Sequence, residues 1–460
     1  MHFIGIDIGT STICGVLYSL SANRQEVLTI ENNANIVTGN SWEKIQDPEK
    51  IFNNVKKIVE EFLEKHHDIK GIGLTGQMHG IVYVDNRGKC LSDLINWQDG
   101  RGNQIYEDNI SYAAWLTKKT GYKVSTGFGL VSHFYNLKNN LVPKSAWKIC
   151  TIMDYVTMRL TGNKDPLTNV TNAASLGFFN LEKMQFDLRI LEKISVHTNI
   201  LPGITNSFDP CGSYRNIPVY IPIGDNQAGF LGSVNHPQKS ILINIGTSGQ
   251  ISAYSNKYFE SDYLDLRPFP GGGYISVGAS LCGGSSFNIL KSFFDRTFEL
   301  FAKSPVEYDF FKMVNSLDTI EYNLDPLIIE TLFEGKRTAP DIRGSIKNIS
   351  ALNLTPSNLI IGFYKGVCEE LYEFYNRFPE TLREKNLSII GSGNALRKNK
   401  LLQKLLEERF QQQLIVPCHN EEAAFGACLC AIIGGKYADN VMEAGKYIKY
   451  NVRDEEYITI

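Results

Sequence analysis

Two short apolar runs open the chain, and within each run hydrophobic residues alternate with small or polar ones. The runs cover residues 3–8 and 13–18, and residues 9–12 between them read Gly-Thr-Ser-Thr. A period of two is typical of a strand, and a short glycine-containing segment between two strands is typical of a turn. The opening of the chain is therefore predicted to be a β-hairpin.

The same pattern returns near the middle of the chain. Residues 241–245 and 250–254 alternate in the same way, and residues 246–248 between them again read Gly-Thr-Ser. One such tripeptide occurs easily by chance, but two of them at matching hairpins indicate an internal duplication. The polar segment 235–240 contains a proline and is interpreted as the connection between the two halves.

Helix and strand patterns alternate through the rest of both halves. Residues 48–65 carry an apolar stripe with charged residues elsewhere, as an amphipathic helix does. Alternation of strands with helices is typical of an α/β protein, which is the fold class we expect. The remaining segments are predicted as strands at 71–75, 217–223, 387–390 and 414–416, and as helices at 397–411 and 422–433. Residues 104–120 and 130–160 are predicted to be mainly helical.

Length and composition indicate the number of domains and argue against several classes of protein. The chain has 460 residues, which is too long for one hydrophobic core, so we expect two domains, 1–235 and 236–460. A hydrophobic content of 43% and a formal net charge of -3 are ordinary for a globular protein, and predict no nucleic-acid or membrane partner. Nine scattered cysteines and a start without a basic signal segment predict a cytoplasmic protein with reduced thiols.

Two common nucleotide-binding motifs do not account for phosphate binding. Residues 71–76 match GxGxxG, but these glycines lie inside a predicted strand and a second strand follows, so the dinucleotide interpretation fails. No GxxxxGK[ST] sequence occurs anywhere in the chain. The two Gly-Thr-Ser turns are the better candidates, because glycine lets backbone N–H groups approach a phosphate closely.

Acidic residues stand beside the predicted turns. Asp7 directly precedes the first Gly-Thr-Ser turn, where a carboxylate can hold Mg²⁺ through water. Asp225 follows the strand 217–223 and opens a segment of small residues that is predicted to be a helix. An Asp at such a position is expected to be an exposed helix N-cap with a low pKa. Its place near mid-chain, between the two turns, makes it our candidate for the chemistry.

A polar cluster in the first half is suited to a polyol. Its side chains come from two short loops, and an aromatic residue beside them can pack against the C–H groups of a sugar. A lone His or Trp is more often structural, but five hydrogen-bonding side chains in two loops favour contact with a substrate. The cluster consists of Gln77, His79, Gln98, Asp99 and Arg101, with Trp97 beside them.

These residues belong to motifs that run from one end of the chain to the other. Taken together, they resemble the FGGY carbohydrate kinases. That family has the two-domain actin/hexokinase/Hsp70-like ATPase fold, in which duplicated ribonuclease H-like domains face each other across an interdomain cleft. Gln-Met-His-Gly is similar to the motif of its ketose kinases, and residues 391–394 are a less regular version of its adenine-site glycines. The matching segments are 5–11, 76–80, 97–101, 154–155, 172–175, 224–228, 246–248 and 334–337.

The resemblance implies transfer of a phosphoryl group from ATP to a sugar hydroxyl. Asp225 would accept or orient the proton of that hydroxyl, and Asp7 would hold Mg²⁺ beside the triphosphate. The implied sugar site consists of Gln77, Met78, His79, Trp97, Gln98, Asp99, Arg101, Phe128, Asn172 and Asn226. The implied nucleotide site consists of Gly9, Thr10, Ser11, Thr12, Gly246, Thr247, Ser248, Gly391, Gly393 and Asn394.

The expected sugar is sedoheptulose, with D-xylulose as the alternative. Residues 125–129 and 172–180 most resemble the family members that act on the seven-carbon ketose. The glycines on either side of Phe128 would leave room for a longer chain and an aromatic face to pack on it. Gln98 and Asn172 would bind the additional hydroxyls. A non-catalytic ATP-binding regulator on the same fold is a third possibility, although such a protein would not need the sugar cluster.

Overall fold

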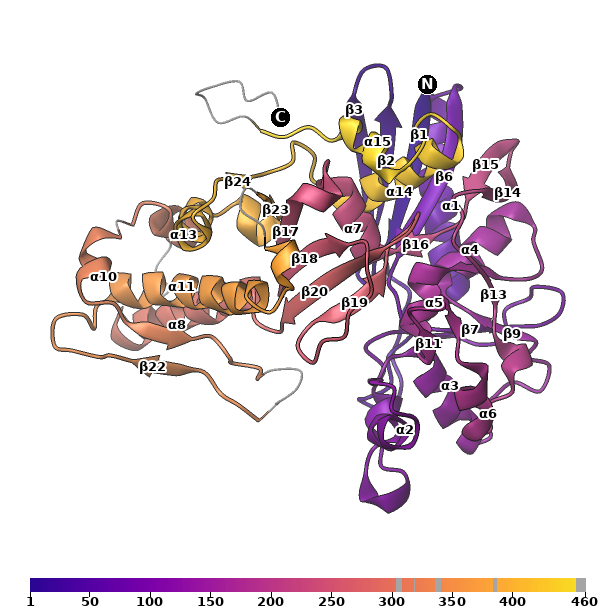
Figure 1. Cartoon of the computed structure of the whole chain (residues 1–460), viewed down its shortest axis with the longest axis horizontal. Coiled ribbons are helices and arrows are strands. Elements are labelled where there is room, and N and C mark those ends of the chain that lie inside the picture. The colour runs from indigo at the N-terminus through magenta and orange to yellow at the C-terminus, as the bar shows by residue number, and fades with distance from the viewer. Residues whose placement is uncertain (303–307, 318, 336–340, 384–386, 452–460) are drawn as a thin grey trace.

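Two β-sheets, one from each half of the chain, form the framework of the molecule (Figure 1). The computed structural model describes residues 1–302, 308–317, 319–335, 341–383 and 387–451. Within these ranges, no helix is long and apolar enough to cross a membrane. Lys336 and Arg337, which belong to one of the family-like motifs, lie outside the described residues.

The first sheet starts with the predicted hairpin. Its seven strands are β1 (His2–Ile8), β2 (Thr12–Ser19), β3 (Arg24–Glu31), β6 (Ile69–Gly76), β14 (Pro210–Tyr214), β15 (Ile217–Tyr220) and β16 (Ile223–Gly224). β1, β2 and β3 form an antiparallel meander. On the other side of β1 lies β6, which is parallel to it, and β15 and β16 are parallel to β6 in turn.

The second sheet repeats this arrangement. Its six strands are β17 (Ser240–Ile245), β18 (Gly249–Ser255), β19 (Asp265–Pro268), β20 (Tyr274–Ser280), β23 (Ser388–Ser392) and β24 (Leu414–Ile415). β17, β18 and β20 form an antiparallel meander, and β23 and β24 continue the sheet parallel to β17. Both sheets therefore place two parallel strands beyond a three-stranded meander, as the duplication of the Gly-Thr-Ser hairpin predicted.

Helices and short strands fill the space around the sheets. The helices of the first half are α1 (Pro48–Lys65), α2 (Tyr112–Thr120), α3 (Gly129–Lys138), α4 (Ile152–Thr161), α5 (Val170–Leu176), α6 (Leu188–Lys193) and α7 (Asp225–Ser233). Those of the second half are α8 (Gly284–Ala302), α9 (Phe310–Val314), α10 (Ile320–Leu324), α11 (Pro356–Tyr375), α12 (Asn394–Arg397), α13 (Lys400–Phe410), α14 (Glu422–Gly434) and α15 (Val441–Ala444). The short strands are β4 (Asn35–Ile36), β5 (Ile45–Gln46), β7 (Val82–Val84), β8 (Leu94–Ile95), β9 (Lys148–Cys150), β10 (Leu167–Asn169), β11 (Phe179–Asn180), β12 (Gln185–Phe186), β13 (Gly203–Thr205), β21 (Ile328–Glu330) and β22 (Ser345–Lys347).

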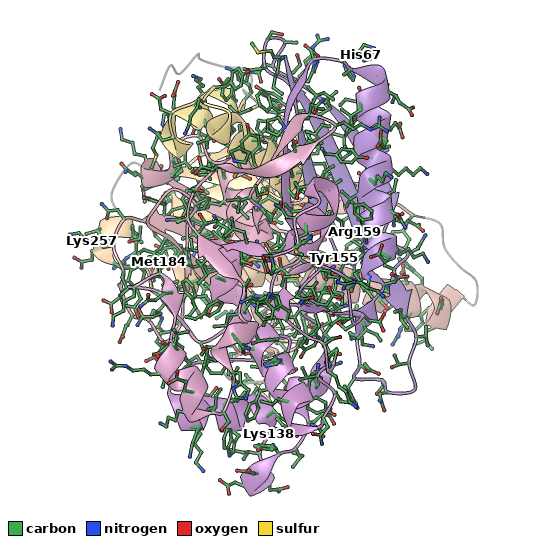
Figure 2. All side chains as sticks on the ribbon, turned by 90° about the vertical axis from the view of Figure 1, so that its right-hand side faces the viewer. His67, Lys138, Tyr155, Arg159, Met184 and Lys257 are labelled. Atoms are coloured by element: carbon green, nitrogen blue, oxygen red, sulfur yellow. The ribbon has the colours of Figure 1, made fainter. Side chains whose placement is uncertain are left out.

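The predicted helix over 48–65 forms with those bounds as α1. Asp47 caps its N-terminus by accepting hydrogen bonds from two backbone N–H groups, and the apolar stripe faces the core. Two residues of α4, Tyr155 and Arg159, reach Glu49 in the first turn of α1, and Figure 2 labels both of them. The mainly helical segment predicted over 130–160 contains two helices, α3 and α4, and β9, which pairs with β7, separates them.

The first sheet is covered on one face by a helix from the far end of the chain. α1 and α4 cover one face, and α14 packs on β1 and β6 at the other (Figure 1). A Cβ atom on Gly5 would lie 1.9 Å from the backbone oxygen of Ala424, and one on Gly73 would lie 1.9 Å from that of Ala427. The glycines of β1 and β6 therefore allow α14 to approach both strands closely. The domain boundary after residue 235 stays a prediction. α14 lies beyond that boundary in the sequence but packs on the first sheet.

Candidate active site

Three parallel strands of the first sheet end side by side. Ile8 of β1, Gly76 of β6 and Gly224 of β16 occupy the same row of the sheet. The residues that follow, which are the first Gly-Thr-Ser turn, Gln77 and Asp225, therefore leave the sheet at one edge. Because carboxyl ends of parallel strands commonly hold ligands in α/β folds, this edge is the candidate active site.

Asp225 differs from its predicted role as an exposed N-cap with a low pKa. Gly224 is the capping residue, and Asp225 is the first residue inside α7, half-buried, with Oδ1 accepting a hydrogen bond from the N–H of Asn226 at 2.7 Å. Burial raises the pKa of Asp225 to about 6, although the Asn226 N–H and the charge of Arg267 act in the opposite direction. The prediction of a low pKa is therefore wrong, because desolvation outweighs the helix terminus.

Asp7 lies close to two other acidic residues. Its side chain is on the face of β1 that α14 covers, and Glu421 directly precedes α14. Burial, followed by the nearby carboxyl groups of Asp225 and Glu421, raises the pKa of Asp7 to about 7. Its Oδ1 atom is buried and has no hydrogen-bond partner. Within the described part of the chain, no group of three or more His, Cys, Asp or Glu side chains converges as a cation site.

The hydroxyl of Thr10 is engaged with the sugar cluster. Thr10 Oγ1 donates to Oε1 of Gln77 at 3.4 Å and accepts from Nε1 of Trp97 at 2.9 Å. Both contacts hold the Thr10 side chain toward the sugar cluster. The backbone N–H groups of the turn remain the predicted contacts of a phosphate.

His79 and Phe128 form an aromatic pair in the sugar cluster. The His79 N–H donates to Oγ of Ser175 at 3.1 Å, and its Nδ1 lies 2.8 Å from the carbonyl oxygen of Ser175. The His79 ring stacks on Phe128, with ring centroids 4.6 Å apart. Met78 is buried against Gly224, which leaves no space for a Cβ atom at that glycine. The segment before α7 is thus held by the same loop that presents His79.

Five predicted sugar contacts are buried within the protein, and three of them, Asp99, Arg101 and Asn172, bond to neighbouring loops. Asp99 is 0% exposed and accepts from Arg101 Nε at 2.6 Å, and Arg101 is nearly buried as well. Asn172 is also 0% exposed and donates to the carbonyl oxygen of Pro222 at 3.1 Å. In this structure these side chains hold the loops in place. The exposed residues of the cluster are Trp97 and Gln98, with Trp97 46% exposed.

The glycines around Phe128 do not provide room for a longer sugar. A Cβ atom on Gly127 would lie 1.9 Å from the carbonyl oxygen of Trp97, and one on Gly129 would lie 2.5 Å from Cγ2 of Ile81. The space beside both glycines is therefore occupied by protein, by the Trp97 loop at Gly127 and by Ile81 at Gly129. The interpretation of them as empty space is wrong, since the contacting atoms come from segments far away in the sequence.

A third loop joins the second Gly-Thr-Ser turn. The N–H of Gly284 donates to the carbonyl oxygen of Gly246 at 2.8 Å, and the N–H of Ser285 donates to that of Thr247 at 2.9 Å. These residues begin α8, and the hydroxyls of Ser285 and Ser286 are buried without a partner. The sequence analysis missed this loop, although two glycines and two serines between a strand and a helix were the signal for it.

The predicted adenine-site glycines have different surroundings. Gly393 has a positive φ of 89°, and a Cβ atom there would lie 2.5 Å from the carbonyl oxygen of Ile245, so this turn packs on the end of β17. Asn394 follows it and is exposed. Gly391 is instead buried inside β23 against Leu396, away from the surface. Of the three, Gly393 and Asn394 are available to a ligand.

Hydrogen bonds join α7 to the second sheet. Nδ2 of Asn226 donates to Oε1 of Gln250 in β18 at 2.8 Å. Nε2 of Gln227 donates to the carbonyl oxygen of Pro268 in β19 at 3.0 Å. The start of α7, with Asp225, therefore faces the second half, and the ends of both sheets contribute to one site.

The model of the FGGY family of carbohydrate kinases, N-terminal domain, matches residues 2–232. The chain belongs to the FGGY family of carbohydrate kinases. It is therefore a kinase that acts on a carbohydrate with ATP as the phosphate donor.

Several relatives of this FGGY kinase match along nearly their whole length. The sedoheptulokinase of Mus musculus is 27% identical over 93% of this chain and 96% of its own. The xylulose kinase of Staphylococcus xylosus is 26% identical over 98% of this chain and 94% of its own.

Among solved structures, ligand-bound xylulose kinase from Lactobacillus acidophilus aligns with a TM-score of 0.83 at 20% identity, covering 98% of this chain and 93% of that one. Plasmodium falciparum glycerol kinase with ADP aligns with a TM-score of 0.80 at 20% identity, covering 97% and 92%. These structures confirm the predicted two-domain actin-like ATPase fold.

Proposed function

We propose that this FGGY kinase transfers the terminal phosphoryl group of ATP to the terminal hydroxyl of sedoheptulose, giving sedoheptulose 7-phosphate. One observation supports a kinase mechanism most strongly: Asp225, with a pKa of about 6, stands where the sugar cluster meets the second half. A ketose bound against His79 and Trp97 would have its reacting hydroxyl at this carboxylate. ATP bound to the second half would approach from the opposite side.

Asp225 is the group that orients the attacking hydroxyl and takes its proton. A carboxylate with a pKa of about 6 is still ionised at neutral pH but accepts a proton more readily than an ordinary aspartate. Phosphoryl transfer has a loose transition state, so orientation of the hydroxyl contributes more than early removal of its proton. The hydrogen bond from the Asn226 N–H fixes one carboxylate oxygen and leaves the other for the substrate.

Two turns and one helix terminus are proposed to hold the nucleotide. The backbone N–H groups of residues 9–12 and 246–248 would contact the phosphates from the two halves. The N-terminus of α8 adds a partial positive charge and the unpartnered hydroxyls of Ser285 and Ser286. Adenosine would lie near Gly393 and Asn394.

The surroundings of Asp7 fit a divalent cation. Its buried Oδ1 has no hydrogen-bond partner, and two neighbouring carboxyl groups make the site strongly negative. Mg²⁺ keeps most of its water, so one protein carboxylate together with ATP oxygens suffices to hold it. Asp7 would hold the ion, which would supply positive charge beside the transferred phosphoryl group.

Sedoheptulose is proposed ahead of D-xylulose on two grounds. The sedoheptulokinase of Mus musculus is similar along the whole chain, although the xylulose kinases are nearly as similar. The exposed Trp97 and Gln98 offer an aromatic face and an amide at the outer end of the sugar cluster, where a longer ketose extends further. D-xylulose is the second candidate, because both sugars would present the same kind of terminal hydroxyl to Asp225.

The deciding experiment measures ADP release with each ketose in turn. We expect kcat/KM to be at least about tenfold higher for sedoheptulose than for D-xylulose, which corresponds to about 1.4 kcal/mol. A preference for D-xylulose would replace the proposed substrate with the second candidate. ATP turnover that no sugar stimulates would contradict the ketose kinase assignment as a whole.

A further inference from the structure

Gln46 is a buried amide between the sugar cluster and the first phosphate turn. Gln46 is the last residue of β5 and pairs with Leu94 of β8. Leu94 lies three residues before Trp97 in the sequence. Gln46 is 0% exposed. It lies in none of the motifs that relate this chain to the FGGY family, and the mechanism above does not use it.

Hydrogen bonds around Gln46 form a closed ring. Its Nε2 donates to the carbonyl oxygen of Thr10 at 2.9 Å, and its Oε1 accepts from Nε2 of Gln77 at 2.8 Å. Oε1 of Gln77 accepts from Oγ1 of Thr10 at 3.4 Å, and this hydrogen bond closes the ring at Thr10. Trp97 is attached to the ring because its Nε1 donates to the same Thr10 hydroxyl at 2.9 Å.

The ring fixes both ends of Thr10 at once. Gln46 holds its backbone carbonyl, while Gln77 and Trp97 hold its hydroxyl. A buried amide that loses its partner costs roughly 1–3 kcal/mol, so the ring resists opening. A change in the position of Trp97, whose face is exposed to a sugar, is therefore transmitted to the backbone of the phosphate turn.

We infer that Gln46 is a positioning residue that couples the sugar site to the phosphate turn, so that a bound ketose and a bound ATP strengthen each other. The inference rests on the proposed sugar and phosphate sites of the same chain. Gln46 touches neither ligand and acts through Thr10, Gln77 and Trp97. Coupling between two sites is reciprocal, so either ligand can be used to measure it.

The coupling is measured as a ratio of dissociation constants. The Kd of a non-hydrolysable ATP analogue with Mg²⁺ is determined by calorimetry without ketose and with saturating ketose. We expect the ketose to tighten analogue binding by about fivefold or more in the wild type. In Gln46→Leu the ratio should fall to within about twofold of unity. The Kd of the ketose without nucleotide should change by a smaller factor than this ratio does.

Two pairs of variants separate coupling from damage to the fold. Tyr83→Phe removes a buried hydroxyl, bonded to Asn136 and His133, from the same half but outside the ring, and should keep the wild-type ratio. Thr10→Val removes the shared hydroxyl and should lose the coupling, whereas Thr10→Ser keeps the hydroxyl and should retain it. Loss of coupling in Tyr83→Phe, or its persistence in both Gln46→Leu and Thr10→Val, would overturn the inference.

A second measurement needs no sugar, and so distinguishes failure of the inference from failure of the proposed function. The emission of Trp97 is obtained by subtracting the fluorescence of Trp97→Phe from that of the wild type. The analogue should change this emission in the wild type and leave it unchanged in Gln46→Leu. If no ketose binds but this change occurs, the substrate proposal fails, while the link through Gln46 between Trp97 and the phosphate turn stands. If the change is absent from the wild type, the coupling fails.

Discussion

At Asp225, position in the helix and burial act on the carboxyl group in opposite directions. The N-terminus of α7 and the charge of Arg267 favour the carboxylate, while desolvation favours the acid. Burial has the larger effect, and the pKa rises to about 6. The residue thus combines full ionisation near pH 8 with a stronger affinity for a proton than an exposed aspartate has.

Replacing Asp225 with asparagine should separate binding from turnover. Asp225→Asn keeps the size of the side chain and its acceptor oxygen but removes the anionic charge that takes the proton. We expect kcat to fall more than tenfold, which is a barrier increase above about 1.4 kcal/mol. The Kd of the sugar, measured by calorimetry, should stay within about threefold of the wild type. A variant with more than a tenth of wild-type kcat would exclude Asp225 as the proton acceptor.

The raised pKa of Asp7 predicts a pH-dependent stability without metal and nucleotide. The folded protein binds a proton at Asp7 more tightly than the unfolded chain does, because the folded pKa is about 7 and the unfolded value is 3.8. The free energy of unfolding should therefore decrease as pH rises from about 4 to 7. Asp7→Asn should be more stable than the wild type at pH 8 by about 1–3 kcal/mol in urea unfolding.

Asp7→Asn should also weaken the use of Mg²⁺ by the enzyme. The Mg²⁺ concentration for half-maximal rate should rise severalfold, while sugar binding is unaffected. An unchanged Mg²⁺ requirement would show that the ion is held elsewhere. An unchanged slope of stability against pH would show that Asp7 is solvated in the free enzyme.

At the level of single residues, sequence motifs selected the candidate residues but not the environments around them. Asp225 and the turn at Thr10 became candidates because they lie in recognisable segments. The raised pKa of Asp225 and the engaged hydroxyl of Thr10 depend on partners from distant strands, which no local pattern reveals. Gln46 was missed for the same reason, since a single Gln before a helix N-cap has no signal of its own.

At the level of elements, the crossing of α7 and α14 sets the position of Asp225. A Cβ atom on Gly426 of α14 would lie 2.0 Å from the carbonyl oxygen of Ala228 in α7. In the same way, a Cβ atom on Gly232 of α7 would lie 2.0 Å from the carbonyl oxygen of Glu422 in α14. The two helices are thus in backbone contact, and the helix that begins with Asp225 is held by them.

Adding one methyl group at this crossing should destabilise the protein. Gly426→Ala forces the two backbones apart, and we expect the free energy of unfolding to fall by about 1–3 kcal/mol. Gly229→Ala is the matched control in α7, because no atom lies within 4 Å of its Cβ position. That control should be neutral or more stable by about 0.5–1 kcal/mol, as expected for Gly to Ala in a helix. Equal effects of the two substitutions would contradict the close packing.

The sequence predicted α14 as a helix but could not assign it to a sheet. Its residues are apolar on every side because β1 and β6 cover one side and α7 another. Such a helix has no polar face, so periodicity does not indicate its direction. The two hairpins were easier to predict, since alternation and the repeated tripeptide are patterns of neighbouring residues. The mainly helical pattern over 130–160 did not reveal β9, because this strand between two helices interrupts the pattern for only three residues.

At the level of the whole molecule, the two halves should move closer to each other when both ligands bind. The proposed phosphate turns lie at the ends of different sheets, so a nucleotide that contacts both draws the sheets together. Small-angle scattering should show a smaller radius of gyration with sugar and a non-hydrolysable ATP analogue than without them. Sugar alone serves as the comparison, and an unchanged radius with both ligands would argue against closure.

The position of α14 has a consequence for the synthesis of this protein. The helix that covers β1 is made roughly 400 residues after β1 itself. At about 5–20 residues per second, that face of the first sheet waits on the order of 20–80 s for its partner. The nascent chain therefore carries an exposed apolar surface throughout translation. Its yield in a cell should depend on chaperones that bind nascent chains more than its final stability suggests.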